Sequence, residues 1–342
     1  MGVKIVNPGV LLTVQDGGRR GYQRYGIAEA GAADRDSMAI ANILAGNDKD
    51  EALLEASLIG PVMEFTADCA IALTGADMSP EINGSPVEMY STIKASAGDI
   101  LSFKGLKNGL RTYIAFAGGL SVGRELGSAS TDIKAGLGGI EGRALKAGDE
   151  LSFAKEFDPE KDLTGRSAER PRELDGNYEL RVIPGPEDDR FTEKGIKTFF
   201  DSEYIVDASS DRMGVRLSGP EIKHIDGADI ISNGIPLGGI QVADNGQPMI
   251  MLSDRQTTGG YTKIGCVASV DIPLIAQAKP GDHIRFRRIS VEDAQTLLRE
   301  RENYYEELKR RLNESKEMQQ PDMEKYRIIV NDKLFVIEIE KR

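Results

Sequence analysis

The sequence predicts a mainly β protein built from two domains, each with its own hydrophobic core. The chain has 342 residues, which leaves room for two domains of ordinary size. It contains 38 glycines, above the roughly 7% average for proteins, and this excess indicates many turns and therefore many strands. Short apolar, β-prone runs also recur at regular spacing between turn-forming residues, as they do in sandwiches and barrels.

The first half is expected to hold a series of short strands and one helix. Residues 10–15 are β-prone, and the loop Asp16–Tyr22 after them is rich in glycine and carries two adjacent arginines. Apolar side chains between Asp34 and Gly46 fall at helical spacing, with Asp34 as the N-cap and Gly46 as the stop. Further strands are expected at 52–58, 62–65, 70–73, 82, 87–90, 100–103 and 110–116.

A repeated phrase organises the two halves. A Gly-Asp turn precedes a β-prone run at 97–103, 147–153 and 280–286. Gly-Asp is a good turn before any strand, yet its recurrence near the end of each half favours two related β domains. These domains are expected at 1–155 and 178–289, joined by an exposed linker at 156–177 that is rich in charged residues and proline.

The second half and the C-terminus continue this pattern. Asp244-Asn245-Gly246 signals a hairpin. Ser290–Asp293 resembles a capping box and opens an amphipathic helix expected over 290–320. Its apolar stripe should dock onto the body or a partner: Ala294, Leu298, Tyr305, Leu308 and Leu312. Residues 321–342 are expected to form a β-hairpin tail around Asn331-Asp332, which must pair with something because an isolated hairpin is marginal.

Charge and missing motifs exclude several classes of function. A net charge of -12 argues against nucleic-acid and anionic-membrane surfaces and favours small-molecule or protein partners. No signal peptide and no long apolar segment occurs, so we expect a soluble, cytoplasmic protein. There is no P-loop, dinucleotide fingerprint, G-x-S-x-G elbow or pair of metal-binding histidines. Cys69 and Cys266 are expected to be small buried hydrophobes, and no residue is assigned as a metal ligand.

The stretch Leu252–Tyr261 is the first candidate site. It places an acid, a guanidinium, an amide, two hydroxyls and Gly259-Gly260 between two β-prone runs that should be buried strands. Arg255, expected to be exposed in a loop, can hold a carboxylate or phosphate bidentately, while the glycines let a ligand approach converging N–H groups. A polar hairpin turn is the alternative interpretation. The loop Asp16–Tyr22 is the second candidate site.

Longer phrases occur in a fixed order over about residues 3–288. They are Thr13–Tyr22, Gly31–Arg35, Ala41-Asn42, Gly46-Asn47, Pro184-Gly185-Pro186, Ser210–Gly219, Gly239–Val242, Gly246-Gln247-Pro248 and Leu252–Tyr261. In these phrases the chain resembles the biotin-dependent carboxyltransferase family, also called the allophanate hydrolase subunit 2 family.

The resemblance implies a fold, partners and cofactors. The two domains are expected to be cyclophilin-like β barrels. The chain should work with a B-type partner, a homologue that is similar to allophanate hydrolase subunit 1, together with an A-type subunit. The tail from Met323 resembles the first hairpin of a biotin carrier domain. No Met-Lys-Met phrase follows it, so biotin is not expected to be attached to this chain.

Three functions are open on this resemblance. The first is a subunit of an ATP-dependent 5-oxoprolinase, which opens the lactam of 5-oxo-L-proline to L-glutamate and uses ATP with Mg at the level of the complex. The second is carboxyl transfer from carboxybiotin on another protein to urea or a related amide. The third is a non-catalytic antagonist that binds a kinase-inhibitor-like protein of the B type.

Site residues follow from the two candidate segments and the resemblance. The expected catalytic residues are arginines that bind carboxylate or phosphoryl oxygens and aspartates that position water: Asp254, Arg255, Asp211 and Arg212. The expected substrate-binding residues are Gln15, Asp16, Arg19, Gln241, Thr257, Thr258, Gly259, Gly260 and Tyr261. Both segments are expected to line one cleft or the face offered to the partner.

Overall fold

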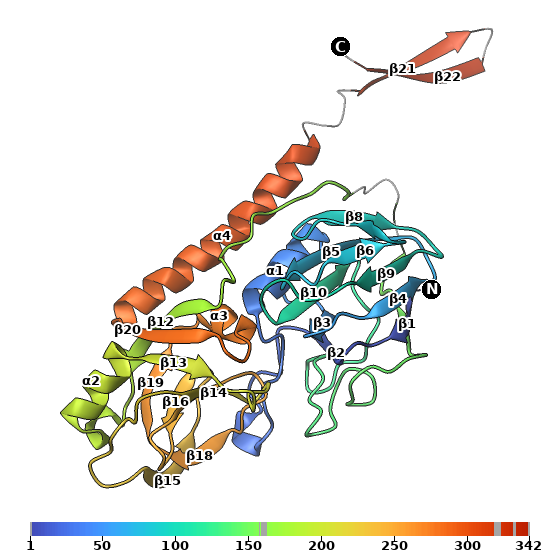
Figure 1. Cartoon of the computed structure of the whole chain (residues 1–342). Coiled ribbons are helices and arrows are strands. Elements are labelled where there is room, and N and C mark those ends of the chain that lie inside the picture. Colours follow the sequence, from blue (N-terminus) through green and yellow to red (C-terminus); the bar gives the residue numbers. More distant parts are fainter. Residues whose placement is uncertain (1, 157, 159–162, 318–322, 331–332, 341–342) are drawn as a thin grey trace.

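The structure is a computed structural model that describes residues 2–156, 158, 163–317, 323–330 and 333–340. It is mainly β, as the sequence predicts, and its two halves lie side by side with one long helix along both (Figure 1). No helix in the described part of the chain is long and apolar enough to cross a membrane.

The first half consists of two sheets around one core. Alternate strand residues such as Val3, Ile5, Leu12 and Val14 are fully buried in this core. One sheet has the strand order β11-β1-β4-β9-β6-β7 and the other β2-β3-β10-β5-β8. The strands are β1 (Gly2–Asn7), β2 (Leu11–Gln15), β3 (Leu53–Ser57), β4 (Val62–Phe65), β5 (Cys69–Gly75), β6 (Pro80–Ile82), β7 (Ser85–Pro86), β8 (Thr92–Ala95), β9 (Ile100–Phe103), β10 (Arg111–Phe116) and β11 (Glu150–Ser152).

The second half is a closed barrel with the strand order β12-β19-β16-β17-β14-β13-β20. The parallel pairing of β12 with β20 closes it. A separate two-stranded ribbon, β15 with β18, lies beside the barrel. The strands are β12 (Asn177–Pro184), β13 (Glu203–Val206), β14 (Gly214–Ser218), β15 (Asp229–Gly234), β16 (Gly239–Val242), β17 (Pro248–Met251), β18 (Thr258–Tyr261), β19 (Lys263–Val267) and β20 (His283–Arg288).

Among the described residues, four α-helices and two 3-10 turns complete the body. Helix α1 (Arg35–Leu44) begins as predicted, because the Asp34 side chain accepts a hydrogen bond from the Ser37 N–H at 2.9 Å. Helix α4 (Val291–Glu317) begins at the predicted capping box, in which Asp293 N–H donates to Ser290 Oγ at 3.0 Å. The others are α2 (Glu193–Asp201), α3 (Ile272–Gln277), η1 (Gln23–Tyr25) and η2 (Asp188–Arg190).

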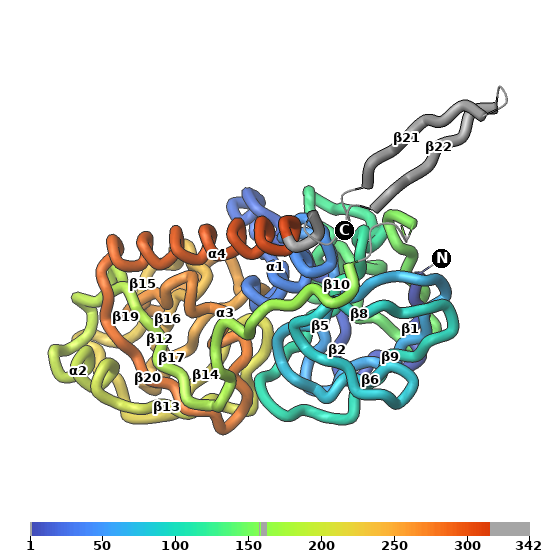
Figure 2. Tube along the Cα trace, turned by 90° about the horizontal axis from the view of Figure 1, so that it is seen from above, coloured from blue at the N-terminus to red at the C-terminus, as the bar shows by residue number. Residues whose placement is uncertain are grey.

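The apolar stripe of α4 docks onto the body. Tyr305, Leu308 and Leu312 are buried in one cluster with α1 and with the outer face of the five-stranded sheet. Seen from above, α4 runs from the barrel across α1 towards the first half (Figure 2). The helix therefore holds the two halves together. The C-terminal part of its stripe is covered by the protein itself, whereas Leu298 of the stripe is exposed.

Two local expectations were wrong. Residues 87–90 form no strand, because Tyr90 has a positive φ of 58° and turns the chain before β8 begins at Thr92. Gly259 and Gly260 form no turn but lie inside β18, where Gly259 is opposite Asn233 of β15. The Asp244-Asn245-Gly246 hairpin between β16 and β17 is confirmed.

The predicted linker and tail lie partly outside the described residues. Of the linker, 157 and 159–162 fall outside them, and the segment after them makes contacts with both halves: Arg170 donates to Asn108 Oδ1 at 3.0 Å, and Arg172 lies 3.1 Å from Asp271. In the tail, β21 (Met323–Val330) pairs with β22 (Lys333–Glu340), whereas the expected turn at 331–332 is not among the described residues.

Candidate functional site

The two segments expected to share a site meet at the junction of the two halves. Arg19 N–H donates to Glu29 O at 2.6 Å, and Ala32 N–H donates to Asp16 O at 3.0 Å. On the other side of the same short segment, Ala30 N–H donates to Ser253 O at 3.1 Å. Residues 29–32 thus join the loop after β2 to the segment after β17.

Asp16 organises a loop rather than facing a cavity. Its carboxylate accepts hydrogen bonds from the Ser128 and Ser130 hydroxyls, both at 2.6 Å, from Ala129 N–H at 2.6 Å and from Gly18 N–H at 2.9 Å. Burial alone would raise the pKa of Asp16, but these hydrogen bonds outweigh it and hold the pKa below its usual value. Its acceptor positions are occupied, so Asp16 holds residues 128–130 in place.

Arg19 and Gln15 lie buried beside it. The Arg19 guanidinium donates to Ser130 O at 2.7 Å and to Glu125 O at 3.1 Å, and no carboxylate within the described ranges forms an ion pair with it. Gln15 Nε2 donates to Thr13 Oγ1 at 3.1 Å and to Thr131 O at 3.2 Å. Both side chains fasten the long loop before β11 to β2.

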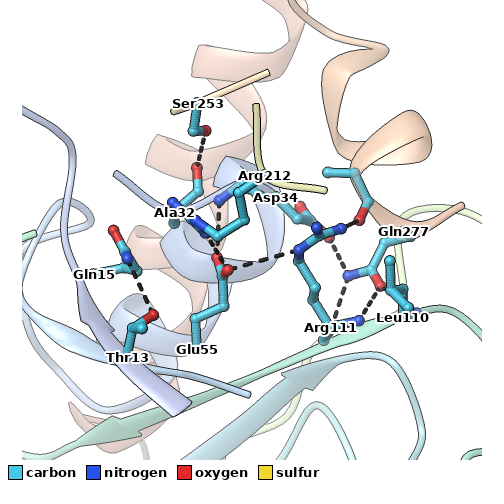
Figure 3. A network of polar contacts seen from close by, with 12 residues as sticks. Thr13, Gln15, Ala32, Asp34, Glu55, Leu110, Arg111, Arg212, Ser253 and Gln277 are labelled. Atoms are coloured by element: carbon cyan, nitrogen blue, oxygen red, sulfur yellow. Dashed lines mark hydrogen bonds and ion pairs between the residues drawn. The ribbon is translucent and has the colours of Figure 1, made fainter. Parts of the chain in front are cut away.

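Arg212 is the centre of a buried ion network between the halves (Figure 3). Its guanidinium contacts Glu55, donates to Asp254 at 2.8 and 3.1 Å, and donates to Gly31 O at 2.7 Å. Glu55 also accepts hydrogen bonds from Ala33 N–H and from the Tyr113 hydroxyl, each at 2.9 Å. Burial alone would raise the pKa of Glu55, but Arg212, Arg111 and the hydrogen bonds from Ala33 and Tyr113 together outweigh it and hold the pKa below its usual value, so Glu55 is charged.

The network continues through Arg111 and Gln277. Gln277 Nε2 donates to Asp34 at 2.8 Å, and its Oε1 accepts from Arg111 N–H at 2.9 Å. Figure 3 shows these groups pointing toward one another from β10, α3 and the start of α1. Burial and the nearby Asp36 carboxylate raise the pKa of Asp34 to about 6. Few donor and acceptor atoms of these buried charged groups are left without a partner. Such a network is suited to fixing the two halves in one arrangement.

The expectation that Arg255 is an exposed loop guanidinium was wrong. The residue is 4% exposed, and it donates to Ile235 O at 3.1 Å and to Leu252 O at 3.3 Å, with Glu29 at 3.5 Å. The chain turns back after β17 and places this side chain under the base of the β15–β18 ribbon. Asp211, by contrast, is exposed and accepts from Met213 N–H at 2.7 Å and Gly214 N–H at 3.2 Å, as a turn-forming aspartate does.

Two of the remaining predicted residues line a groove on the outside of the barrel. Gln241 of β16 and Tyr261 of β18 line it, and its volume is about 340 Å³. Thr258, Gly259 and Gly260 belong to the same strand as Tyr261, and Thr257 precedes it. Gln241 is 2% exposed, and neither Nε2 nor Oε1 of its amide has a hydrogen-bond partner among the residues that the structure describes.

Sequence reasoning missed the carboxylates on the first-half side of the junction. Glu55 stands inside the fully buried strand β3, and a lone acid in an apolar strand was the available signal. Glu29, which pairs with Arg35 at 2.7 Å, gave no such signal because it lies in an irregular loop. No group of three or more His, Cys, Asp or Glu side chains in the described ranges is arranged to hold a metal ion.

Comparisons with known proteins agree with the fold and with each other. Residues 25–288 match the family model "Carboxyltransferase domain, subdomain A and B". The chain is 37% identical to the C-type subunit of the Escherichia coli 5-oxoprolinase over 91% of this chain and 99% of that protein. It is 34% identical to the corresponding 5-oxoprolinase subunit of Haemophilus influenzae, over 88% of this chain and 96% of that one.

A solved structure shows the same arrangement within a much longer protein. The crystal structure of the K. lactis urea amidolyase superposes with a TM-score of 0.83 at 30% identity over 90% of this chain. The chain spans 20% of that protein.

Proposed function

Because the chain belongs to the family of the carboxyltransferase domain, subdomain A and B, we propose that it is the C-type subunit of an ATP-dependent 5-oxoprolinase. In this role it opens 5-oxo-L-proline to L-glutamate together with an A-type and a B-type subunit. One observation carries the proposal: the C-type subunit of the Escherichia coli 5-oxoprolinase aligns along 99% of its own length at 37% identity.

The reaction asks for three things from its subunits. Water must attack the lactam carbonyl carbon, the C–N bond must break, and the leaving nitrogen must take up a proton. An unstrained amide resists this, so ATP supplies the driving force by phosphorylating the lactam oxygen. Once water has added and the C–N bond has broken, a second water hydrolyses the resulting acyl phosphate to L-glutamate and phosphate. A subunit that holds the lactam contributes orientation and exclusion of water, which can supply a large share of a rate enhancement.

We place ATP and Mg on another subunit of the complex. The donor set here does not fit them, because the sequence has no P-loop and the described residues hold no group of acidic side chains arranged for a metal ion. The part of this chain in the reaction is therefore substrate binding and assembly. The groove at Gln241 and Tyr261 is the place we assign to the substrate.

The buried arginines have an indirect role in this proposal. Arg212, held by Asp254, crosses the junction to Glu55, while Arg255 crosses it to Glu29 and binds Ile235 O at the base of the β15–β18 ribbon. Asp211, Asp16 and Arg19 shape loops. We therefore regard these six residues as positioning residues.

Carboxyl transfer is the second candidate, and the TM-score of 0.83 to a urea amidolyase favours it. In that case the acceptor would be urea or a related amide, and the carboxyl group would arrive on a biotin attached to another protein. The same groove would then receive the ureido ring of biotin.

The test is substrate-dependent ATP hydrolysis by the assembled proteins. The chain is mixed with its B-type and A-type partners, and ADP and L-glutamate are measured with 5-oxo-L-proline. Urea is tested in parallel with a carboxybiotinylated carrier. We expect ADP and glutamate to form together and only when all three subunits and 5-oxo-L-proline are present. Carboxylated urea without glutamate formation would replace the proposal with the second candidate.

A further inference from the structure

One row of outward-facing side chains crosses four neighbouring strands of the barrel. Arg216 of β14 is opposite Met249 of β17, Met249 is opposite Gln241 of β16, and Gln241 is opposite Lys263 of β19. The residues on either side of this row, including Val215, Leu217, Ile240 and Val242, belong to the barrel core. Because side chains alternate along a strand, the row faces away from the core.

The ribbon covers one end of this row and leaves the other end open. Tyr261 of β18 lines the groove with Arg216, Gln241 and Met249. A Cβ placed on Gly259 would lie 2.8 Å from Gln241 Nε2, so the ribbon backbone passes directly over the amide. The open end is bordered by Asp207 and Gln247. The groove therefore has an apolar floor, a buried amide at the covered end and a guanidinium toward the open end.

The amide of Gln241 is the unexplained group in this groove. A buried primary amide with neither its donor nor its acceptor paired is uncommon in folded proteins. Lys263, its neighbour in the row, has partners: Nζ donates to Asn233 Oδ1 at 2.6 Å and lies 3.2 Å from Glu187. Unlike Lys263 beside it, Gln241 thus has a buried amide without a partner, which is a signature of a site completed by a ligand.

The shape of the unpaired group defines the ligand. A primary amide presents an N–H donor beside a C=O acceptor, and its complement is an amide whose own N–H and C=O lie on the same side. Ring closure enforces this cis arrangement in lactams and cyclic ureas. The ring of 5-oxoproline and the ureido ring of biotin both have it.

Arg216 distinguishes 5-oxoproline from biotin as the ligand of this groove. Its side chain is exposed, and no carboxylate in the described ranges lies close enough to form an ion pair with it. Asp207, on the rim of the same groove, interacts with it only at longer range, so the guanidinium can still bind an anion. It stands two strands from Gln241, roughly 10 Å between backbones, and its long side chain can reach back over Met249. A carboxylate attached directly to the ring suits this spacing, and 5-oxoproline has one. Biotin carries its carboxyl group at the end of a chain.

We propose that this groove binds 5-oxo-L-proline, with the lactam paired to the Gln241 amide and the carboxylate to Arg216. This inference rests on the proposed function and names the substrate site within it. Both amide atoms of Gln241 are shielded by the ribbon, so the ribbon shifts at Gly259–Tyr261 when the ligand enters. The ribbon is able to do so because β15 and β18 pair with each other and with no other described strand.

The test is isothermal titration of the full-length chain with three small probes. 5-Oxo-L-proline should bind, pyrrolidin-2-one should bind more weakly because it lacks the carboxylate, and L-proline should not bind because it lacks the amide. Gln241→Leu should weaken 5-oxo-L-proline at least tenfold while leaving the thermal midpoint unchanged or higher, since it removes an unpaired buried amide.

Arg216→Gln is the second variant. Because Arg216 is exposed, this substitution should leave the fold intact. It should weaken 5-oxo-L-proline at least tenfold and leave pyrrolidin-2-one unchanged. Gln295→Leu and Arg299→Gln, both exposed on α4, are the matched controls and should bind as the unmodified chain does. Unchanged binding in Arg216→Gln and Gln241→Leu would overturn the proposal, and so would an absence of 5-oxo-L-proline binding to both the chain and the complex.

Two further arms separate this site from the proposed function and from biotin. Binding of biotin methyl ester in place of 5-oxo-L-proline would assign the groove to the ureido ring and overturn the lactam. In the assembled enzyme both variants should raise KM for 5-oxo-L-proline at least tenfold. Turnover with unchanged KM would refute the groove and leave the proposed function standing. Binding to the groove without any lactam opening by the complex would do the reverse.

Discussion

Arg212 shows how much a single side chain contributes at the junction. It is 7% exposed, and it neutralises Glu55, which is 1% exposed and belongs to the other half of the molecule. Without Arg212, Glu55 would keep only Arg111, at 3.7 Å, as a cationic partner, so much of its buried charge would lose compensation in a poorly polarisable environment. The ion network is therefore a requirement for the arrangement of the halves more than a source of net stability.

Arg212→Ala should lower the free energy of unfolding by about 3 to 5 kcal/mol, because Glu55 would stay buried without its closer guanidinium and with only Arg111, at 3.7 Å, to offset its charge. Urea denaturation followed by circular dichroism measures this. Arg216→Ala, an exposed arginine on the following strand, is the matched control and should change stability by less than about 0.5 kcal/mol. Equal effects of the two substitutions would show that the network does not stabilise the fold.

Asp34 should make stability depend on pH. Its pKa is about 6 in the folded protein against an ordinary value of 3.8, since burial and Asp36 disfavour the charged form. The folded state therefore holds the proton more tightly, so the stabilising contribution is complete below pH 3.8 and is lost as the pH rises through about 6.

Asp34→Asn removes this dependence while keeping a capping side chain on α1. The stability of the unmodified protein relative to this variant should fall by up to about 3 kcal/mol between pH 4 and pH 7. Urea denaturation of both proteins across this range gives the difference. A difference that stays constant with pH would show that Asp34 does not titrate there.

At the scale of elements, α4 is the part whose role changed most between sequence and structure. Its stripe could have faced a partner, but it packs on α1, and the Tyr305 hydroxyl donates to Asp36 at 2.6 Å. The helix also contacts the segment between the halves through Arg166. The helix therefore contacts the body along much of its length and stabilises the arrangement of the two halves.

Leu308→Ala should therefore destabilise the protein by about 2 to 4 kcal/mol, because Leu308 is 2% exposed in the cluster with α1. Leu298→Ala, in the same helix at 36% exposure, should cost less than about 1 kcal/mol. Thermal melts and limited proteolysis of the helix compare them. Matching losses in both variants would contradict a docked helix.

At the scale of the whole molecule, we predict a stable complex with a B-type partner. The relatives that align end to end are named as subunits, and the acidic surface and the absence of a nucleic-acid or membrane signature leave protein partners open. Co-expression followed by sedimentation velocity should show the two proteins moving together at micromolar concentration. A chain that sediments alone beside its B-type neighbour would refute the complex.

The sequence by itself determined the local elements. The bounds of β4 and β9 and the start of α1 follow from apolar alternation, Gly-Asp turns and an aspartate cap, which act over a few residues. The mainly β class and family membership follow from the same short-range signals and from the ordered motifs. The prediction of a strand at 87–90 was wrong because Tyr90 has a positive φ. The Tyr90 hydroxyl accepts a hydrogen bond from Gly75 N–H, so the conformation of this residue depends on a neighbouring strand.

Tertiary structure alone decided what the site residues do. Asp16, Arg19, Arg212 and Arg255 each bind groups far away in the chain, such as Ser130, Glu55 and Ile235, and no spacing in the sequence reveals such partners. The amide of Gln241 has no hydrogen-bond partner in the described residues, whereas the amide of Gln15 donates to Thr13 and Thr131. Nothing in the sequence distinguishes these two glutamines. A polar side chain can hold the fold together or can bind a ligand. Which of the two it does depends on the distant atoms that surround it, and only the folded chain determines those.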